Sequence, residues 1–271
     1  MMENITFLRE RLTMIKEKKS LKQKLLSKEL TIGSWLSFGY TPICEMMAKS
    51  EFEWLVIDME HTATDYYNAL QMIQIINLCN CIPLVRVGAN EELHIKRVMD
   101  SGAHGVIVPM VNTKEDAERA VSYIKYPPSG KRGVGLFRAQ GYGMDFNNYN
   151  KWVETESICI VQIEHFKGVE NLNDILSVEG VDGFIVGPYD LSGSIGFPGD
   201  FNNTNVIQLM EEVTKFVKKS DKPGGFHIVH SDHELLKSKI DDGYKFLAYG
   251  DDMVFLAEKI KEENKFLLNL K

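Results

Sequence analysis

The sequence predicts an α/β protein built as a (β/α)8 barrel of the TIM type, on three observations. Its 271 residues, 44% apolar and 25% charged, have a globular composition, and one barrel of roughly 250 residues fits this length. Short runs rich in Val, Ile and Leu alternate with longer segments whose apolar residues recur at helical spacing. Eight such runs can be counted, and eight strand–helix units close into a barrel.

The predicted strands are continuous apolar runs, as is typical of parallel strands covered on both faces. They begin at Thr31, Trp54, Pro83, Gly105, Ile158, Gly183, Pro223 and Phe246. Helical spacing predicts helices between them over 69–78, 93–101, 114–124, 206–219 and 233–242. The irregular segment 126–150 is long for a compact barrel, so we expect a functional or interface loop there. We therefore predict an N-terminal helical arm, 1–30, followed by a single barrel domain, 31–271.

Composition and charge argue against several classes of protein. The net charge is −7, and residues 1–30 carry eight basic against four acidic side chains. Because acidic residues interrupt this basic arm, we expect a solvated helix and no nucleic-acid binding. No apolar run reaches the roughly 18 residues of a membrane span, and no signal peptide is evident at the N-terminus. The four cysteines lie in apolar segments without metal or redox spacing, so we expect buried, reduced thiols and a cytoplasmic protein.

Two carboxylates stand where consecutive predicted strands end. Active sites of this fold lie at the carboxyl ends of the strands, and Glu164 and Asp190 occupy that position. Oxygen ligands without Cys or paired His suit a hard divalent cation, Mg²⁺ or Mn²⁺, with Co²⁺ as a further candidate. The alternative for either residue is a salt bridge to a neighbouring helix.

Three other residues suggest acid–base or anion chemistry. Arg86 lies inside an apolar run, where a guanidinium needs an anion, either a substrate carboxylate or an internal acid. His61 follows Asp58 by three residues, a spacing at which the carboxylate can orient the imidazole for proton transfer. His227, His230 and His233 also recur at intervals of three, but residues three apart on a strand point to opposite faces, which disfavours a zinc site.

Seven ordered segments carry a family resemblance: GSWLS, WLVIDMEH, PLVRV, IKRVMDSGAHGVIVPMV, YPPSGKRGVG, IVQIE and GFIVGPYDLSGSIGFPG. Together they resemble the HpcH/HpaI family of metal-dependent pyruvate aldolases from about Ile32 to Phe255. The resemblance implies a divalent metal on Glu164 and Asp190. It also implies a proton-transfer pair of His61 and Asp58, and an Arg86 that contacts bound pyruvate or its enolate. Further residues are implied to hold the oxo acid or to shape the pocket and its entrance: Gln162, Gly187, Pro188, Tyr189 and Asp100.

Two departures from the family pattern affect the pocket wall. Tyr189 stands where Ala is common, and the segment DMEH has Met59 where Gly often follows the Asp. Neither departure removes a metal ligand or the base, so the expected reaction type is unchanged. The identity of the substrate stays open. The tyrosines and asparagines of 141–150 favour a polar, sugar-like aldehyde.

We therefore expect a class II aldolase that reversibly cleaves a 4-hydroxy-2-oxo acid into pyruvate and an aldehyde through a metal-stabilised enolate. His61 would remove the 4-hydroxyl proton. One alternative is a lyase of the citrate lyase or malyl-CoA lyase type, which needs a coenzyme A site. Another is a barrel that binds a ketoacid without catalysis, although all five key residues are present. The resemblance also implies a homo-oligomer, a hexamer or trimer of dimers, that exchanges the C-terminal helix from about residue 252 onward.

Overall fold

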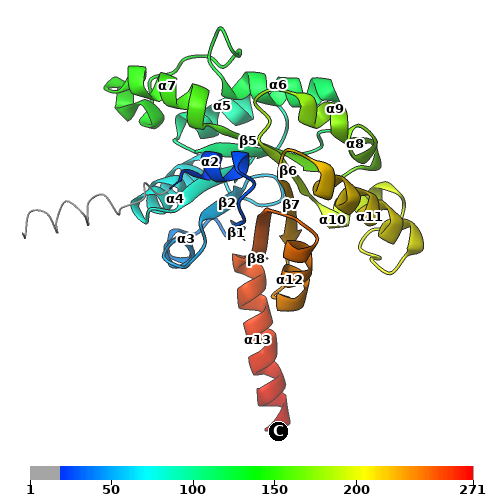
Figure 1. Cartoon of the computed structure of the whole chain (residues 1–271). Coiled ribbons are helices and arrows are strands. Elements are labelled where there is room, and N and C mark those ends of the chain that lie inside the picture. Colours follow the sequence, from blue (N-terminus) through cyan, green and yellow to red (C-terminus); the bar gives the residue numbers. More distant parts are fainter. Residues whose placement is uncertain (1–18, 271) are drawn as a thin grey trace, which may run out of the picture.

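Eight parallel strands close into one barrel in chain order, as drawn in Figure 1, in a computed structural model that describes residues 19–270. The predicted barrel is confirmed, and each strand begins within one residue of its predicted start. The strands are β1 (Thr31–Leu36), β2 (Trp54–Asp58), β3 (Ile82–Arg86), β4 (Gly105–Val108), β5 (Ile158–Ile163), β6 (Gly183–Val186), β7 (Gly224–Ile228) and β8 (Phe246–Asp251).

Helices follow the strands and surround the barrel, and the five predicted ones are confirmed to within three residues at each end. The helices are α2 (Leu21–Leu26), α3 (Thr41–Ala48), α4 (Tyr66–Leu78), α5 (Glu92–Asp100), α6 (Lys114–Ile124), α7 (Phe146–Glu156), α8 (Phe166–Glu170), α9 (Leu172–Ser177), α10 (Pro188–Ser194), α11 (Thr204–Lys219), α12 (His233–Asp241) and α13 (Asp252–Asn269), with a 3₁₀ helix, η1 (Arg138–Gly143). The loop expected over 126–150 is thus partly helical, through η1 and the start of α7.

Large side chains fill the interior of the barrel. Alternate strand residues point inward, and the rings of Trp54 and Phe246 stack there with centroids 4.1 Å apart. Gly33 must lack a side chain, because an added Cβ would lie 2.1 Å from the Trp54 ring. The outward-facing residues form a second apolar cluster beneath the helices. The interior is therefore a packed core, and open space for a ligand is left at the mouth.

Helix α2 closes the amino-terminal end of the barrel. Leu21 and Leu25 are buried among the inward-facing strand residues. Lys22 Nζ lies 2.5 Å from the Asp182 carboxylate and donates to the Ser157 carbonyl oxygen at 2.9 Å, at the starts of β6 and β5. This part of the predicted arm thus packs into the barrel core. The division at residue 30 stays a prediction, and residues 1–18 lie outside the described chain.

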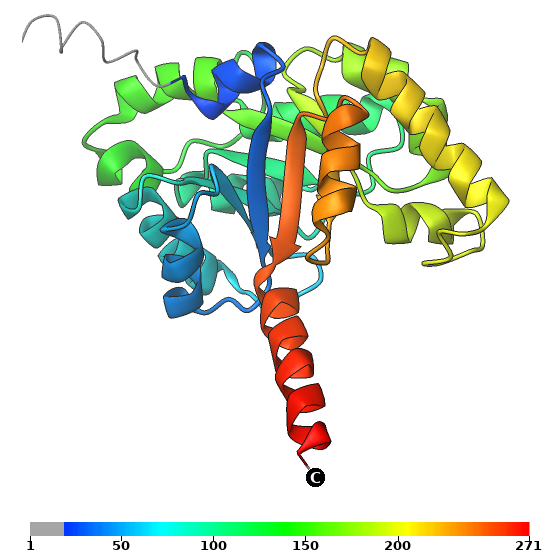
Figure 2. The ribbon, with the colours of Figure 1, turned by 60° about the horizontal axis from the view of Figure 1, so that its bottom comes forward.

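Helix α13 leaves the barrel after β8 and projects away from it in both views (Figures 1 and 2). Only its first residue, Asp252, is buried. Its large exposed apolar side chains are Met253, Leu256, Ile260, Phe266, Leu267 and Leu268. A helix with this much uncovered apolar surface indicates a contact with another molecule. None of the helices in 19–270 has the length and apolar character needed to cross a lipid bilayer.

Replacing Leu25 by Ala should destabilise the fold by about 3 kcal/mol, because it removes a fully buried side chain from the base of the barrel. Urea denaturation followed by circular dichroism measures the free energy of unfolding. Leu26→Ala is the matched control, since its neighbouring side chain is 69% exposed and should change stability by less than about 0.5 kcal/mol. Equal effects of the two substitutions would contradict the role of α2 as a plug.

Candidate active site

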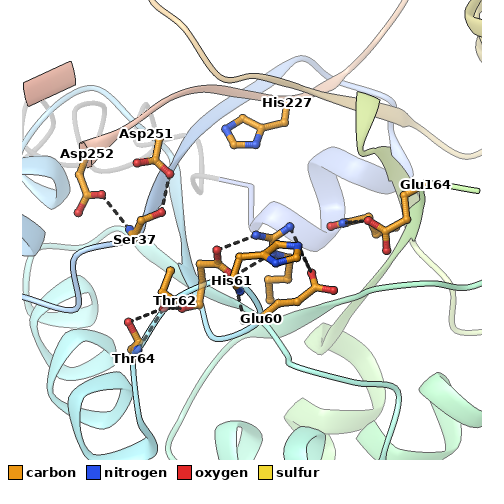
Figure 3. Close-up of polar contacts among 12 residues, drawn as sticks. Ser37, Glu60, His61, Thr62, Thr64, Glu164, His227, Asp251 and Asp252 are labelled. Atoms are coloured by element: carbon orange, nitrogen blue, oxygen red, sulfur yellow. Dashed lines mark hydrogen bonds and ion pairs between the residues drawn. The ribbon is translucent and has the colours of Figure 1, made fainter. Parts of the chain in front are cut away.

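A cavity of about 430 Å³ opens at the carboxyl ends of the strands, where the fold is expected to place its active site. Its lining brings together residues from several strands and the loops that follow them. Those that the sequence predicted are Asp58, His61, Arg86, Gln162, Gly187, Pro188, Tyr189 and Asp190. Glu164 directly follows β5, at the same end of the barrel, with only 3% of its surface exposed. Figure 3 shows the Glu60 side chain pointing toward Glu164.

A buried ion pair joins β2 to β3 inside this cavity. Asp58 and Arg86 are opposite one another in the strand register, and Arg86 donates from Nε and Nη2 to the two carboxylate oxygens at 2.9 and 2.6 Å. Arg86 Nη1 also lies 3.2 Å from Glu60 Oε2. Burial raises the pKa of Asp58, but the hydrogen bonds and charge of Arg86 outweigh it and leave this pKa below its usual range. The internal acid considered as a partner for Arg86 is Asp58.

Asp58 contacts His61 through the backbone. Its Oδ1 accepts the N–H groups of Glu60 and His61 at 3.0 and 3.4 Å, which holds the turn after β2. Because Arg86 and these N–H groups already occupy the carboxylate, the expected Asp58–imidazole contact is not among those of residues 19–270. The imidazole stands at the rim with 60% of its side chain exposed, its Nε2 3.8 Å from Glu60 Oε2. The proton-transfer role of His61 stays a prediction.

The Glu164 carboxylate is fixed from two sides. Its Oε1 accepts the Met110 N–H at 2.6 Å, and its Oε2 accepts the Gln162 side-chain amide. Gly187 on the neighbouring strand end leaves room for it, since an added Cβ would lie 3.1 Å from Glu164 Oε2. Glu164 is therefore oriented before any ligand arrives, by hydrogen bonds and by a missing side chain.

Three carboxylates crowd this side of the cavity. Burial raises the pKa of Glu60 to about 7; the Arg86 charge opposes that shift, and the charges of Glu164 and Asp190 add to it. Burial also raises the pKa of Glu164, with Asp190 contributing. A divalent cation between Glu164 and Asp190 would relieve this repulsion, so the donor set fits a hard metal ion. No group of three or more His, Cys, Asp or Glu side chains in 19–270 is arranged to hold a metal, so water and substrate would complete the coordination.

Other polar residues of the cavity had no predicted role. Trp35, Ser37, His227 and Asp251 line it from β1, β7 and β8. Alternate residues along a strand point inward, and this pattern could have identified them from the sequence. His227 faces the cavity, whereas His230 Nδ1 lies 3.0 Å from Glu258 Oε1 on α13.

Two expectations fall outside this cavity. Asp100 is the last residue of α5, which runs back toward the amino ends of the strands, and its Oδ1 accepts from Arg132 Nη2 at 2.6 Å. It does not line the cavity of its own chain. Tyr142 and Asn148, from the segment expected to favour a polar aldehyde, line a different cavity beside Gly102. Asp100 and the segment with Tyr142 and Asn148 lie far from the carboxyl ends of the strands, because the helices carry the chain back to the opposite end of the barrel.

A larger, more apolar cavity of about 710 Å³ lies between α11 and α12 and shares Tyr189 and His227 with the first. Three lysines stand at its edge, but carboxylates lie nearby. Lys218 and Lys239 lie 3.9 and 3.5 Å from Asp242, and Lys215 lies 3.9 Å from Glu211. They form no uncompensated positive cluster of the kind that coenzyme A phosphates require.

Comparison with known proteins shows the family of this chain. A sequence model described as HpcH/HpaI aldolase/citrate lyase matches residues 32–258. The chain belongs to this family. It is 33% identical to the hydroxypyruvate/pyruvate aldolase of Roseobacter denitrificans over 88% of this chain and 92% of that protein. It is also 33% identical to the 2-keto-3-deoxy-L-rhamnonate aldolase of Escherichia coli K12, over 89% and 90% of the two chains.

A solved structure of an HpcH/HpaI family protein from Burkholderia cenocepacia superposes with a TM-score of 0.85 at 30% identity, covering 91% of this chain and 98% of that one. The predicted membership and the predicted class of enzyme, a carbon–carbon lyase of the aldolase type, are thereby confirmed.

Glu60→Gln should stabilise metal-free protein increasingly as pH rises. The folded-state pKa of about 7 lies above the usual 4.5, so ionising Glu60 costs folding free energy that is absent below pH 4.5 and complete above pH 7. We expect the variant to gain roughly 1 kcal/mol over wild type between pH 5 and pH 8, since water screens part of the effect.

Urea titrations with a chelator present measure this difference. Glu211→Gln, an exposed carboxylate on α11, is the control and should show no such trend. A gain for Glu60→Gln that is the same at both pH values would contradict the argument.

Proposed function

We propose that this protein is a metal-dependent aldolase that reversibly cleaves 4-hydroxy-2-oxo acids to pyruvate and an aldehyde. One observation carries the proposal: an oriented Glu164, an adjacent Asp190 and a buried Arg86 meet at the mouth of the barrel. Two anionic ligands and one fixed cation suit an oxo acid whose 2-oxo oxygen becomes negative during carbon–carbon cleavage. The paired lysines of the second cavity do not favour the coenzyme A-dependent alternative.

Glu164 and Asp190 would hold the divalent cation, with Mg²⁺ or Mn²⁺ as first candidates and Co²⁺ after them. When bound, the cation supplies Lewis-acid stabilisation of negative charge on the 2-oxo oxygen. Gln162 fixes Glu164 through its amide and also lines the cavity, where it can contact the oxo acid. Gly187 and Pro188 form the adjoining wall.

Arg86 would stabilise the same developing oxyanion. Its hydrogen bonds to Asp58 use two of the five guanidinium N–H groups, which leaves donors for an oxygen in the cavity. Because Asp58 holds the guanidinium at both contacts, little reorganisation is needed when the negative charge forms. Asp58 is thus proposed as a positioning residue for Arg86 and, through the backbone, for His61.

His61 would move the proton of the 4-hydroxyl group. The imidazole is at the rim of the cavity, where it can exchange protons with water between turnovers. In cleavage it removes the hydroxyl proton, and in condensation it returns one.

Pyruvate alone tests the core of this proposal. Condensation begins with loss of a methyl proton, so the methyl NMR signal of pyruvate in D₂O should decay faster with protein and Mn²⁺ or Mg²⁺ than without protein. Arg86→Ala should slow this exchange by roughly a hundredfold, as expected when a fixed oxyanion donor is lost. Glu164→Ala and Asp190→Ala should abolish it and weaken Mn²⁺ binding, measured by electron paramagnetic resonance.

Glu170→Ala is the control, an exposed carboxylate on α8 outside the cavity, and should behave as wild type. Full exchange after rigorous chelation would refute the metal assignment. No protein-dependent exchange with metal present would favour a barrel that only binds a ketoacid.

We also propose that α13 docks on a second copy of the chain within a hexamer or trimer of dimers. Leu256 and Ile260, one helical turn apart, are 47% and 51% exposed within the part of the chain that the structure describes. Leu256→Asp combined with Ile260→Asp should therefore shift the mass in light scattering to a smaller species. Lys265→Asp, also on α13, is the charged control. A double variant with wild-type mass would contradict docking through this face.

A further inference from the structure

We propose that the β1–β7–β8 wall of the cavity, made by Trp35, Ser37, His227 and Asp251, binds hydroxyl groups of the aldehyde, so that the preferred aldehyde is neutral and hydroxylated. The proposal rests on the aldolase function proposed above and names its second substrate class. In Figure 3, Ser37 and Asp251 lie on the other side of the cavity from Glu164, with His227 between them. A substrate anchored at Glu164 and Asp190 would extend its aldehyde part toward this wall.

Asp251 is a buried carboxylate with acceptor capacity to spare. It is 5% exposed; its Oδ2 accepts from the Ser37 hydroxyl at 2.6 Å and its Oδ1 accepts the Met253 N–H at 2.9 Å. No Lys, Arg or His among residues 19–270 forms a salt bridge with it. A carboxylate has about four acceptor positions, so further O–H donors can bind. The Ser37 hydroxyl, while donating to Asp251, can accept one more hydrogen bond.

The aromatic part of the wall carries an unpaired donor. Trp35 is 2% exposed, and its indole Nε1–H has no acceptor within the described chain. This observation is independent of the carboxylates, and it points to a ligand oxygen because an orphaned buried donor is costly. His227 stacks on Trp35 at 4.5 Å and uses Nε2 to donate to the Gly250 carbonyl at 3.2 Å, which leaves Nδ1 as an acceptor.

Burial lowers the pKa of His227 to about 4, so the ring is neutral near pH 7. The wall therefore offers acceptors at Asp251 and His227 and a donor at Trp35. A hydroxyl group matches both, because it donates and accepts. An ammonium group only donates, so it would leave Trp35 unsatisfied.

The charge of the cavity disfavours anionic aldehydes. Asp58, Asp190 and Asp251 line it, and Arg86 is the one Lys or Arg among its described lining residues. Arg86 is already paired with Asp58. A phosphate or second carboxylate on the aldehyde would meet Asp251 without a countercharge.

Three aldehydes with one carbon skeleton test this inference: propanal, glyceraldehyde and glyceraldehyde 3-phosphate, each condensed with pyruvate. We expect kcat/KM for glyceraldehyde to exceed that for either of the others by roughly 10–100-fold, the range for hydrogen bonds to a buried charged partner. Asp251→Asn keeps the side-chain shape and removes the charge, and Trp35→Phe removes the indole N–H together with one ring. Both should lower the glyceraldehyde-to-propanal ratio by about tenfold. Asp242→Asn, a carboxylate outside this cavity, should leave the ratio unchanged.

Preference of wild type for propanal or for the phosphate would overturn the inference, as would an unchanged ratio in either folded variant. Trp35→Phe carries the test if Asp251→Asn does not fold, since an aromatic ring remains to pack at this position. Pyruvate methyl exchange in wild type separates the two proposals. Exchange without preference for glyceraldehyde refutes the hydroxyl-binding wall alone, whereas absence of exchange refutes the aldolase function.

Discussion

The Asp58–Arg86 ion pair is the contact on which the site depends. It spans two adjacent strands in register, and both partners are largely removed from water. Deleting one partner of such a pair leaves an uncompensated buried charge, which typically costs about 3–5 kcal/mol. The same carboxylate holds the turn that carries His61, and the guanidinium lies 5.2 Å from the centre of the Trp35 ring. One interaction thus links the rim, the proposed oxyanion donor and the wall of the cavity.

In the cavity around this pair, acidic side chains outnumber basic ones. Burial and neighbouring carboxylates raise the pKa of Glu60 and of Glu164. Asp251 stands apart from them and forms no salt bridge with a basic side chain of residues 19–270. Such an arrangement lowers the stability of the protein without ligands, and bound ligands relieve the repulsion. Functional sites commonly lower local stability in this way. Packing of the apolar barrel interior and of α2 stabilises the fold and offsets the repulsion at the mouth of the barrel.

Patterns that act locally could be predicted from the sequence. The strands were evident because buried parallel strands are continuous apolar runs. Glu164 and Asp190 were evident because they follow two of these runs, although the strand expected to reach Asp190 ends at Val186 and Asp190 lies in the first turn of α10. Contacts between distant segments could not. The spacing of Asp58 and His61 suggested a side-chain contact, but Arg86, 28 residues after Asp58, takes both carboxylate oxygens. Asp251 was missed because its local sequence does not show whether the side chain lines a cavity or caps a helix.

The plug formed by α2 also bears on how the chain reaches its native state. Leu25 packs with Phe246 and Ala248 of β8, and Lys28 Nζ donates to the Ser220 carbonyl oxygen at 3.2 Å. The first described helix to leave the ribosome therefore finds the last of its partners only when β8 has been made. Contacts of such long sequence separation form slowly, and the apolar face of α2 is not fully covered before β8 is present. The barrel is therefore completed only after β8 has been synthesised, and α2 closes it at the end opposite the active site.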